Sequence, residues 1–330
     1  MVRSIRVFAA GFIAVSLSAF QIAPAALPPG LAALADDRAA ARSFDYMTLK
    51  AQGADLGAHA NAIYRRTQPA PGVRRCMTAG EAEMQASLLA AKEATDTAAF
   101  EDDRAAASDA WGKWGLFTEG LGHGQVATEP PFSWVSERLT EAAAQTDPRV
   151  RELLMRTARD QLIRRGYEGG VQVWGELSPG AEARVMTALN NQMCEADLAN
   201  TAWLKADIAA NGWFLISTTG EEASRAAWLM TQHADRDLPF QKHVLSILEP
   251  LAVAGEASMG NFAYLYDRVA MNENRPIRYG TQGRCVARNV WGPLDLEDPD
   301  RIEALRAEAD IGSLAEYAAH MNRYCADFEG

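Results

Sequence analysis

Helix-start signals, each followed by apolar residues at helical spacing, constrain the fold of this chain more than any other feature of its sequence. Asp147–Pro148 is an N-cap followed by a first-turn proline, and apolar residues then recur every three or four positions. A later capping box, Ser313 with Glu316, precedes the last stripe of this kind. These patterns predict a mainly α-helical protein, with a compact multi-helix domain over residues 147–330.

Within this domain, glycine, proline and polar turns separate the predicted helices. The ranges that the spacing gives most clearly are 147–166, 178–193, 197–211 and 261–271. Residues 277–291 lack helical spacing, and we expect them to form a small β-hairpin around Gly283.

The preceding region, residues 36–146, is predicted to be helical with one long Gly/Pro loop. Residues 81–114 are rich in alanine and form one long helix or two. Four glycines and the pair Pro130–Pro131 fall within residues 115–131, which are therefore expected to be a loop. Aromatic residues at both ends of this loop are more consistent with anchoring it to the core than with lining a ligand groove.

Residues 1–25 have the layout of a secretory signal peptide. Arg3 and Arg6 precede an apolar stretch over 7–20, and small residues then offer cleavage after Ala25 or as late as Ala35. The apolar stretch is shorter than the roughly 20 residues that a membrane span needs, so an uncleaved anchor is the weaker alternative. We predict a periplasmic or secreted protein with no stable membrane insertion after cleavage.

The composition is that of a folded, acidic protein. Hydrophobic residues make up 48% and charged residues 23% of the chain, and the net charge is −11. Such a chain is repelled by the phosphates of nucleic acids and by anionic lipid surfaces. The charge therefore excludes a general nucleic-acid-binding role.

The four cysteines are expected to form two disulfides. None belongs to a CxxC pair or has the spacing of zinc ligands, and an even number in an oxidising compartment indicates disulfide pairing. Three connectivities are possible. We favour Cys285–Cys325 with Cys76–Cys194, because the first pair lies wholly within the C-terminal domain; free buried thiols are the alternative.

Three motifs in the C-terminal domain resemble those of a bacterial protein family known only as a domain of unknown function. They are Gln232-His233-Ala234-Asp235, Ala263-Tyr264-Leu265-Tyr266-Asp267-Arg268-Val269 and Arg278-Tyr279-Gly280-Thr281-Gln282. The resemblance extends over about residues 151–317 and implies no activity. Phe214 departs from it, since a proline is expected after Gly212-Trp213.

His233 and Asp235 are the candidate catalytic residues. A histidine near a carboxylate can serve as a general base, although a lone histidine on an apolar helix face is more often a hydrogen-bonded core residue. Together with Asp237 and His243, these two could also supply nitrogen and oxygen ligands to a metal ion, but their spacing fits no strict ligand pattern. The metal hypothesis is accordingly the weaker one.

The polar and aromatic residues of the three motifs are the candidate binding residues. Buried polar side chains must be matched, either by one another or by a ligand. The candidates are Gln232, Tyr264, Asp267, Arg268, Tyr279 and Gln282. Arg268 could hold a carboxylate or phosphate of a ligand, or it could pair with Asp235 and join two helices.

Three functions remain open from the sequence. The first is an exported module that binds a small molecule, a peptide or an envelope protein. The second is a hydrolase with a His/Asp acid–base pair or metal site, and the third is a structural helical scaffold. No nucleophile elbow, phosphate-binding loop, dinucleotide fingerprint or HExxH motif is present, and no cofactor is predicted.

Overall fold

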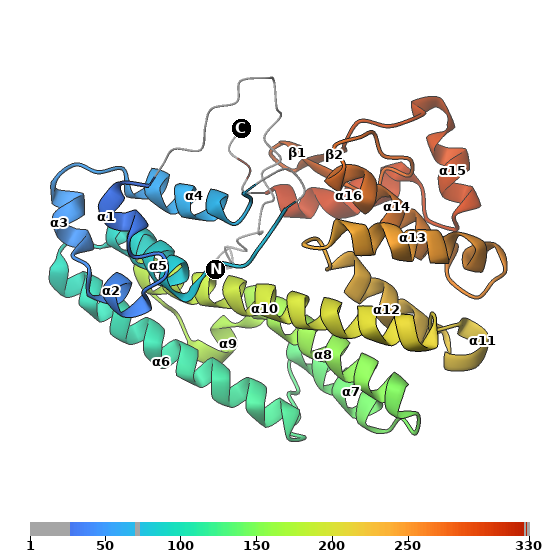
Figure 1. Ribbon diagram of the computed structural model, residues 1–330, viewed down its shortest axis with the longest axis horizontal. Helices are drawn as coiled ribbons and strands as arrows, with labels where there is room; N and C mark the ends of the chain where they lie inside the picture. Colours follow the sequence, from blue (N-terminus) through green and yellow to red (C-terminus); the bar gives the residue numbers. More distant parts are fainter. Residues whose placement is uncertain (1–26, 70–72, 327, 329–330) are drawn as a thin grey trace, which may run out of the picture. The chain divides into compact units, whose positions relative to one another are not determined.

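The computed structural model describes residues 27–69, 73–326 and 328, and it confirms a mainly α-helical protein with one small β-hairpin. The predicted signal peptide, residues 1–25, lies outside the described residues. The chain divides into two compact units, one ending at Asp197 and the other beginning at Leu198. Figure 1 labels the elements of both units.

In the N-terminal unit, short helices cover a central helix and a helical pair follows. Helices α2, α3 and α4 pack on α5, while α7 packs on α8. The elements are α1 (Pro29–Ala32), α2 (Arg38–Ser43), α3 (Tyr46–Ala51), α4 (Leu56–Arg66), α5 (Ala79–Glu93), α6 (Thr97–Gly122), α7 (Phe132–Ala143), α8 (Pro148–Gly169), α9 (Val171–Trp174) and the first part of α10 (Pro179–Asn211).

Two apolar clusters form the core of this unit. The first gathers side chains from α1 to the start of α6, including Leu31 and Met84. The second lies among α6, α7, α8 and α10, around Trp114 and Leu189. Because each helix presents an apolar stripe, burial of these stripes stabilises the unit.

Glu81 is a buried carboxylate at the start of α5, with 0% of its surface exposed. Arg66 Nε donates to it at 2.8 Å, and Arg75 donates through Nη1 at 2.6 Å and Nη2 at 2.7 Å. It also completes a capping box with Thr78. Burial alone raises the pKa of Glu81, but the hydrogen bonds from Arg75 and Arg66 outweigh burial and bring this pKa down to about 2.

The predicted long loop over 115–131 is wrong in its first half. Helix α6 continues through three of the four glycines and ends at Gly122. A glycine inside a helix costs only about 1 kcal/mol, and the buried Trp114, whose indole donates to Gln192 Oε1 at 3.0 Å, ties this part of α6 to α10. Tertiary packing therefore overrides the weak helix propensity.

The predicted break between residues 193 and 197 is also absent. A single helix, α10, runs over 33 residues from Pro179 to Asn211. After Gly180 the segment contains no proline or glycine, so no residue in it opposes continuous helix formation.

The described part of the C-terminal unit contains six α-helices after α10 and one hairpin. Helix α14 contacts α12 and α13, while α16 packs on strand β2 (Figure 1). The elements after α10 are α11 (Ile216–Thr219), α12 (Glu221–Gln232), α13 (Leu238–Val253), α14 (Met259–Asn272), β1 (Gly283–Ala287), β2 (Val290–Pro293), the 3₁₀ turn η1 (Pro299–Arg301), α15 (Ile302–Glu308), α16 (Leu314–Met321) and the 3₁₀ turn η2 (Asn322–Cys325).

The β-hairpin is present, but its turn is not at Gly283. Strands β1 and β2 are antiparallel, and the turn falls at residues 288–289, where Asn289 adopts a φ of 57°. Gly283 begins β1 and pairs with Pro293. A Cβ at Gly283 would lie 2.1 Å from the ring of Trp291, so this glycine provides space for the indole rather than for a turn.

The cysteine pairing bears on the cellular compartment. The four cysteines form the pairs Cys76–Cys194 and Cys285–Cys325, which confirms two disulfides with the favoured connectivity. The first pair lies in the N-terminal unit, and the second joins β1 to η2. Among the described residues, no helix has the length and apolar character needed to cross a bilayer.

Candidate functional site

The three motif segments of the C-terminal unit all contribute residues to one pocket of about 270 Å³. Gln232 and His233 come from the end of α12, Tyr264 and Arg268 from α14, and Gln282 from the segment before β1. Four of the six candidate binding residues and one of the two candidate catalytic residues therefore line the same hollow.

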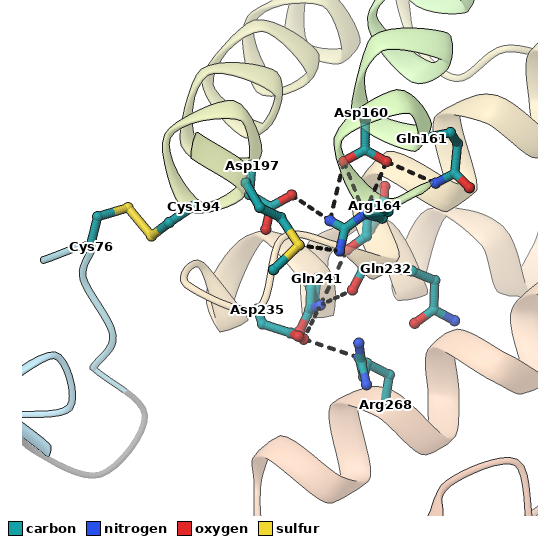
Figure 2. A network of polar contacts seen from close by, with 12 residues as sticks. Cys76, Asp160, Gln161, Arg164, Cys194, Asp197, Gln232, Asp235, Gln241 and Arg268 are labelled. Carbon is teal, nitrogen blue, oxygen red and sulfur yellow. Dashed lines mark hydrogen bonds and ion pairs between the residues drawn. A yellow bond between two sulfur atoms is a disulfide. The ribbon is translucent and has the colours of Figure 1, made fainter. Parts of the chain in front are cut away.

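The polar side of the pocket contains one amide whose hydrogen-bonding capacity is unused. Gln232 is only 7% exposed, and its side chain makes no hydrogen bond within the described part of the chain (Figure 2). Arg268 Nη1 donates to Gln282 Oε1 at 3.2 Å, and Gln282 Nε2 donates to Thr281 Oγ1 at 3.4 Å. The Gln232 amide therefore keeps its donor and acceptor atoms for a group placed in the pocket.

The other side of the pocket is aromatic. Trp228, Tyr264, Tyr317 and Trp291 form a chain of edge-to-face contacts, with ring centroids 6.1, 6.0 and 5.3 Å apart in succession. Burial raises the pKa of both tyrosines, so their hydroxyls stay neutral at ordinary pH. The pocket lining thus combines hydrogen-bonding groups with rigid rings.

Asp235 does not line the pocket but lies beside it, next to Arg268. Its Oδ1 is 3.1 Å from Arg268 Nε, and Gln241 Nε2 and Asn272 Nδ2 donate to the same oxygen at 3.2 and 3.1 Å (Figure 2). These contacts fix the carboxylate and the guanidinium relative to each other. They connect Arg268 of α14 to the turn between α12 and α13.

Asp267 also lies outside the pocket lining, where it holds the backbone of the third motif. The side chain is 0% exposed and accepts from the amides of Arg278 at 2.8 Å, Tyr279 at 3.0 Å and Thr281 at 2.8 Å. The Thr281 hydroxyl donates to it as well, at 3.0 Å. Burial raises the pKa of Asp267, while these hydrogen bonds act in the opposite direction.

A buried arginine supports the same segment from the other side. Arg306, 2% exposed, donates to the carbonyls of Tyr279 at 2.6 Å and Gly312 at 2.7 Å. Tyr317 donates from its hydroxyl to the Thr281 carbonyl at 3.0 Å. Tyr279 itself is buried edge-on against Tyr266 and contributes structure rather than pocket surface.

The four weak metal-ligand candidates do not converge. Asp237 caps α13 by accepting from the Phe240 amide at 3.0 Å, and it pairs with Lys205 at 2.5 Å. His243 is exposed on α13. No three of His233, Asp235, Asp237 and His243 bring ligand atoms close enough for one ion.

Seven pocket residues were missing from the sequence-based candidates: Trp228, Leu229, Thr281, Gly283, Trp291, Tyr317 and Met321. Tyr317 and Met321 fall on the apolar stripe of the last helix, so the sequence pattern assigns them to the core. The spacing of aromatic residues alone does not separate a core ring from a pocket wall.

The N-terminal unit contains a buried ion-pair network centred on Arg164. Arg164 lies between Asp160, 3.1 Å away, and Asp197, 2.6 Å away, and both carboxylates are nearly inaccessible (Figure 2). Gln161 Nε2 also donates to Asp160, at 2.9 Å. The coulombic attraction of the two aspartates outweighs burial and raises the pKa of Arg164, so its guanidinium stays charged. This network joins α8 to α10.

Comparison with known proteins gives a family but no activity. No curated protein and no solved structure matches the chain. A family model described as a family of unknown function, DUF6624, matches residues 148–326, more than half of the chain, including all three motifs and the pocket. The protein therefore belongs to the DUF6624 family of unknown function.

Proposed function

We propose that this protein is an exported binding protein whose C-terminal unit holds a small molecule or the end of a peptide in the pocket described above. The observation that carries the proposal is the nearly buried Gln232 amide, which lines the pocket without a hydrogen-bonding partner among the described residues. The amide is accessible from the pocket, so a ligand placed there could accept from it or donate to it.

The composition of the pocket supports binding over a purely structural role. A scaffold needs apolar filling between its helices, yet here a hollow of about 270 Å³ is lined by an arginine, two glutamines and a threonine as well as by aromatic rings. Ligand sites in proteins typically combine apolar walls with a few placed polar groups.

The hydrolase alternative has weaker support. A general acid or base must be able to reach the substrate proton. The Asp235 carboxylate is engaged by Arg268, Gln241 and Asn272 and does not line the pocket.

Export is supported by the two disulfides, because such bonds persist in oxidising compartments. The structure also bears on the cleavage position. Leu31 is 1% and Ala35 is 2% exposed in the first apolar cluster, and the Thr78 hydroxyl donates to the Ala35 carbonyl. Cleavage after Ala35 would remove core residues, so cleavage after Ala25 is the position compatible with this packing.

The binding proposal is tested by recovering the ligand. The full chain, with disulfides intact, is incubated with a small-molecule extract of bacterial envelopes, washed and denatured, and the released compounds are identified by mass spectrometry. Gln232→Phe, which fills the pocket, should abolish recovery. Arg225→Phe, at an exposed position on the same helix, should not. Equal recovery from both variants would argue against the pocket.

The export proposal is tested separately, by expressing the full chain in a Gram-negative host. We expect it in the periplasmic fraction, with an amino terminus at or just after residue 26. A cytoplasmic, uncleaved product would contradict it.

A further inference from the structure

We infer that the ligand of this pocket is a ring-sized group that bears a carboxylate, with the carboxylate on Arg268 and the ring against the aromatic side. This inference rests on the proposed binding function and adds the chemical class of the ligand. It is carried by the charge of the pocket lining, the orientation of Arg268 and the size of the hollow.

The pocket lining has a positive group and no negative one. None of its residues is an aspartate or glutamate, and its two tyrosines are neutral. Arg268, with about one-fifth of its side chain exposed, brings a permanent cation to the wall. A carboxylate is therefore electrostatically compatible with this lining, whereas an ammonium group would find no acid among the lining residues.

Arg268 is held in a position that leaves one edge of its guanidinium for a ligand. Asp235 lies against Nε, and Gln282 accepts from Nη1. Nη2 makes no hydrogen bond to any described residue. The Nη1–Nη2 edge can therefore receive both oxygens of a carboxylate, which is the bidentate geometry that guanidinium groups favour.

Asp235 positions the Arg268 guanidinium rather than competing with a ligand carboxylate for it. Gln241 and Asn272 both donate to its Oδ1, so part of its charge is compensated before it reaches Arg268. Gln241 is fully buried and also bonds to the Thr231 carbonyl at 3.1 Å, which fixes the end of α12 relative to the start of α13. The guanidinium is thereby oriented before any ligand arrives, which lowers the entropic cost of binding.

The volume limits the rest of the ligand to about one ring. Pockets for drug-sized ligands begin at roughly 300 Å³, and this one measures about 270 Å³. Trp228, Tyr264, Tyr317 and Trp291 provide a rigid apolar surface of matching extent, while Gln232 can donate to or accept from a ring substituent. An aromatic acid and an acidic sugar both satisfy these requirements.

The test uses the Met321 methyl group, which lines the pocket, as an NMR reporter in the full chain labelled at methionine methyls. Met84, fully buried in the N-terminal unit, serves as the internal control. The probes are benzoate, glucuronate, benzylamine and glucose. We expect the Met321 signal to shift with benzoate or glucuronate, with a Kd on the order of 1 mM for so small a molecule, and the Met84 signal to stay in place. Which of the two acids binds more tightly identifies the source of the carboxylate.

Two variants connect the shift to the proposed contacts. Arg268→Gln should weaken binding of the acid by about tenfold or more, because a hydrogen bond to a charged group is lost. Gln232→Met keeps nearly the same volume and removes only an amide without a partner, so it should fold normally and weaken binding severalfold. Arg225→Gln, on the same helix but outside the pocket, should bind as the unmodified protein does.

The outcomes separate the two proposals. If benzylamine or glucose shifts Met321 at equal or lower concentration than either acid, the carboxylate inference is overturned and the binding role of the pocket stands. If none of the four probes shifts Met321, both the inference and the proposed binding function are overturned.

Discussion

Each unit of this protein contains a fully buried carboxylate, and the two differ in what surrounds them. Glu81 in the N-terminal unit is held mainly by two arginines, whereas Asp267 in the C-terminal unit is held by three backbone amides and a hydroxyl. The pKa of Glu81 is lowered to about 2, while that of Asp267 is raised. Equal burial therefore gives opposite responses, because full positive charges offset desolvation and neutral dipoles offset less of it.

The two carboxylates also hold different parts of the structure in place. Glu81 begins a helix and joins it to the preceding extended segment through Arg75. Asp267 shapes the segment that carries Thr281 and Gln282 into the pocket. Loss of the first should be a matter of stability alone, and loss of the second should affect the candidate site as well.

The largest effect is expected from Asp267→Ala. Removing the carboxylate leaves three backbone amides without an acceptor in a buried place, and each such donor costs about 1–3 kcal/mol. We expect the free energy of unfolding in urea to fall by about 4 kcal/mol and the Met321 methyl signal to move without any ligand. Asp295→Ala, at an exposed position, is the control, and a similar small loss in both variants would refute this role.

Glu81→Gln should cost less, about 3 kcal/mol in the same measurement. Arg66 and Arg75 lose their shared anion, but their side chains are 41% and 38% exposed and can recover water. Glu93→Gln, at the exposed end of the same helix, should leave stability nearly unchanged. A loss larger than that of Asp267→Ala would reverse the comparison.

The pH dependence of stability should show the two carboxylates with opposite signs. Glu81 has a folded pKa of about 2 against an ordinary 4.5, so its stabilisation is complete above pH 4.5 and is lost as the pH falls toward 2. Asp267 has a folded pKa above its ordinary 3.8, so its contribution becomes less favourable as the pH rises past 3.8.

Urea unfolding of each variant against the unmodified chain, from pH 2 to 7, measures these contributions. The stability advantage over Glu81→Gln should grow by about 2 kcal/mol between pH 2 and 4.5 and then level off. The advantage over Asp267→Asn should instead decrease with rising pH above 3.8. Two curves of the same slope would show that both carboxylates respond alike.

The smallest effects concern the capping hydroxyls of the two units. Thr78→Ala and Ser313→Ala each remove an N-cap, at a cost of about 1 kcal/mol. Thr78 should cost more, because its hydroxyl also donates to the Ala35 carbonyl in the first apolar cluster. Thermal melts of the two variants, compared with Thr78→Ser, measure the difference; identical losses would mean that the contact with Ala35 adds nothing.

The fold was largely predictable because its signals are local. The N-cap at Asp147 and the capping box at Ser313 depend on neighbours within one helical turn, and each is found where the sequence places it. Two predictions based on glycine were wrong. In α6, the glycines were expected to form a loop, but packing of Trp114 outweighs their low helix propensity. Gly283 was expected at the turn of the hairpin, but it makes room for an indole ring from the opposite strand.

The candidate site was predictable in part. In the three motifs, polar residues recur where a helical domain usually has apolar ones. This pattern made Gln232, Arg268 and Gln282 candidate binding residues, and all three line the pocket. The sequence could not separate Asp267, which bonds inward to backbone, from its neighbour Arg268, which faces the pocket. That distinction depends on which way each side chain leaves the helix in a packed structure, and adjacent residues on a helix point in different directions.

The adjacent positions of Asp267 and Arg268 on α14 limit how the sequence of this segment can diverge during evolution. One holds the backbone of residues 278–281 and the other contacts Gln282 directly, so a single helical turn carries both the support and the recognition group. Gly280, with a φ of 65° and 3.0 Å between a would-be Cβ and Leu314, leaves little freedom for substitution in between. In divergent relatives, the aspartate, the arginine and the glycine should therefore be conserved together. An alignment in which they vary independently would indicate that the pocket has lost its binding role in those relatives.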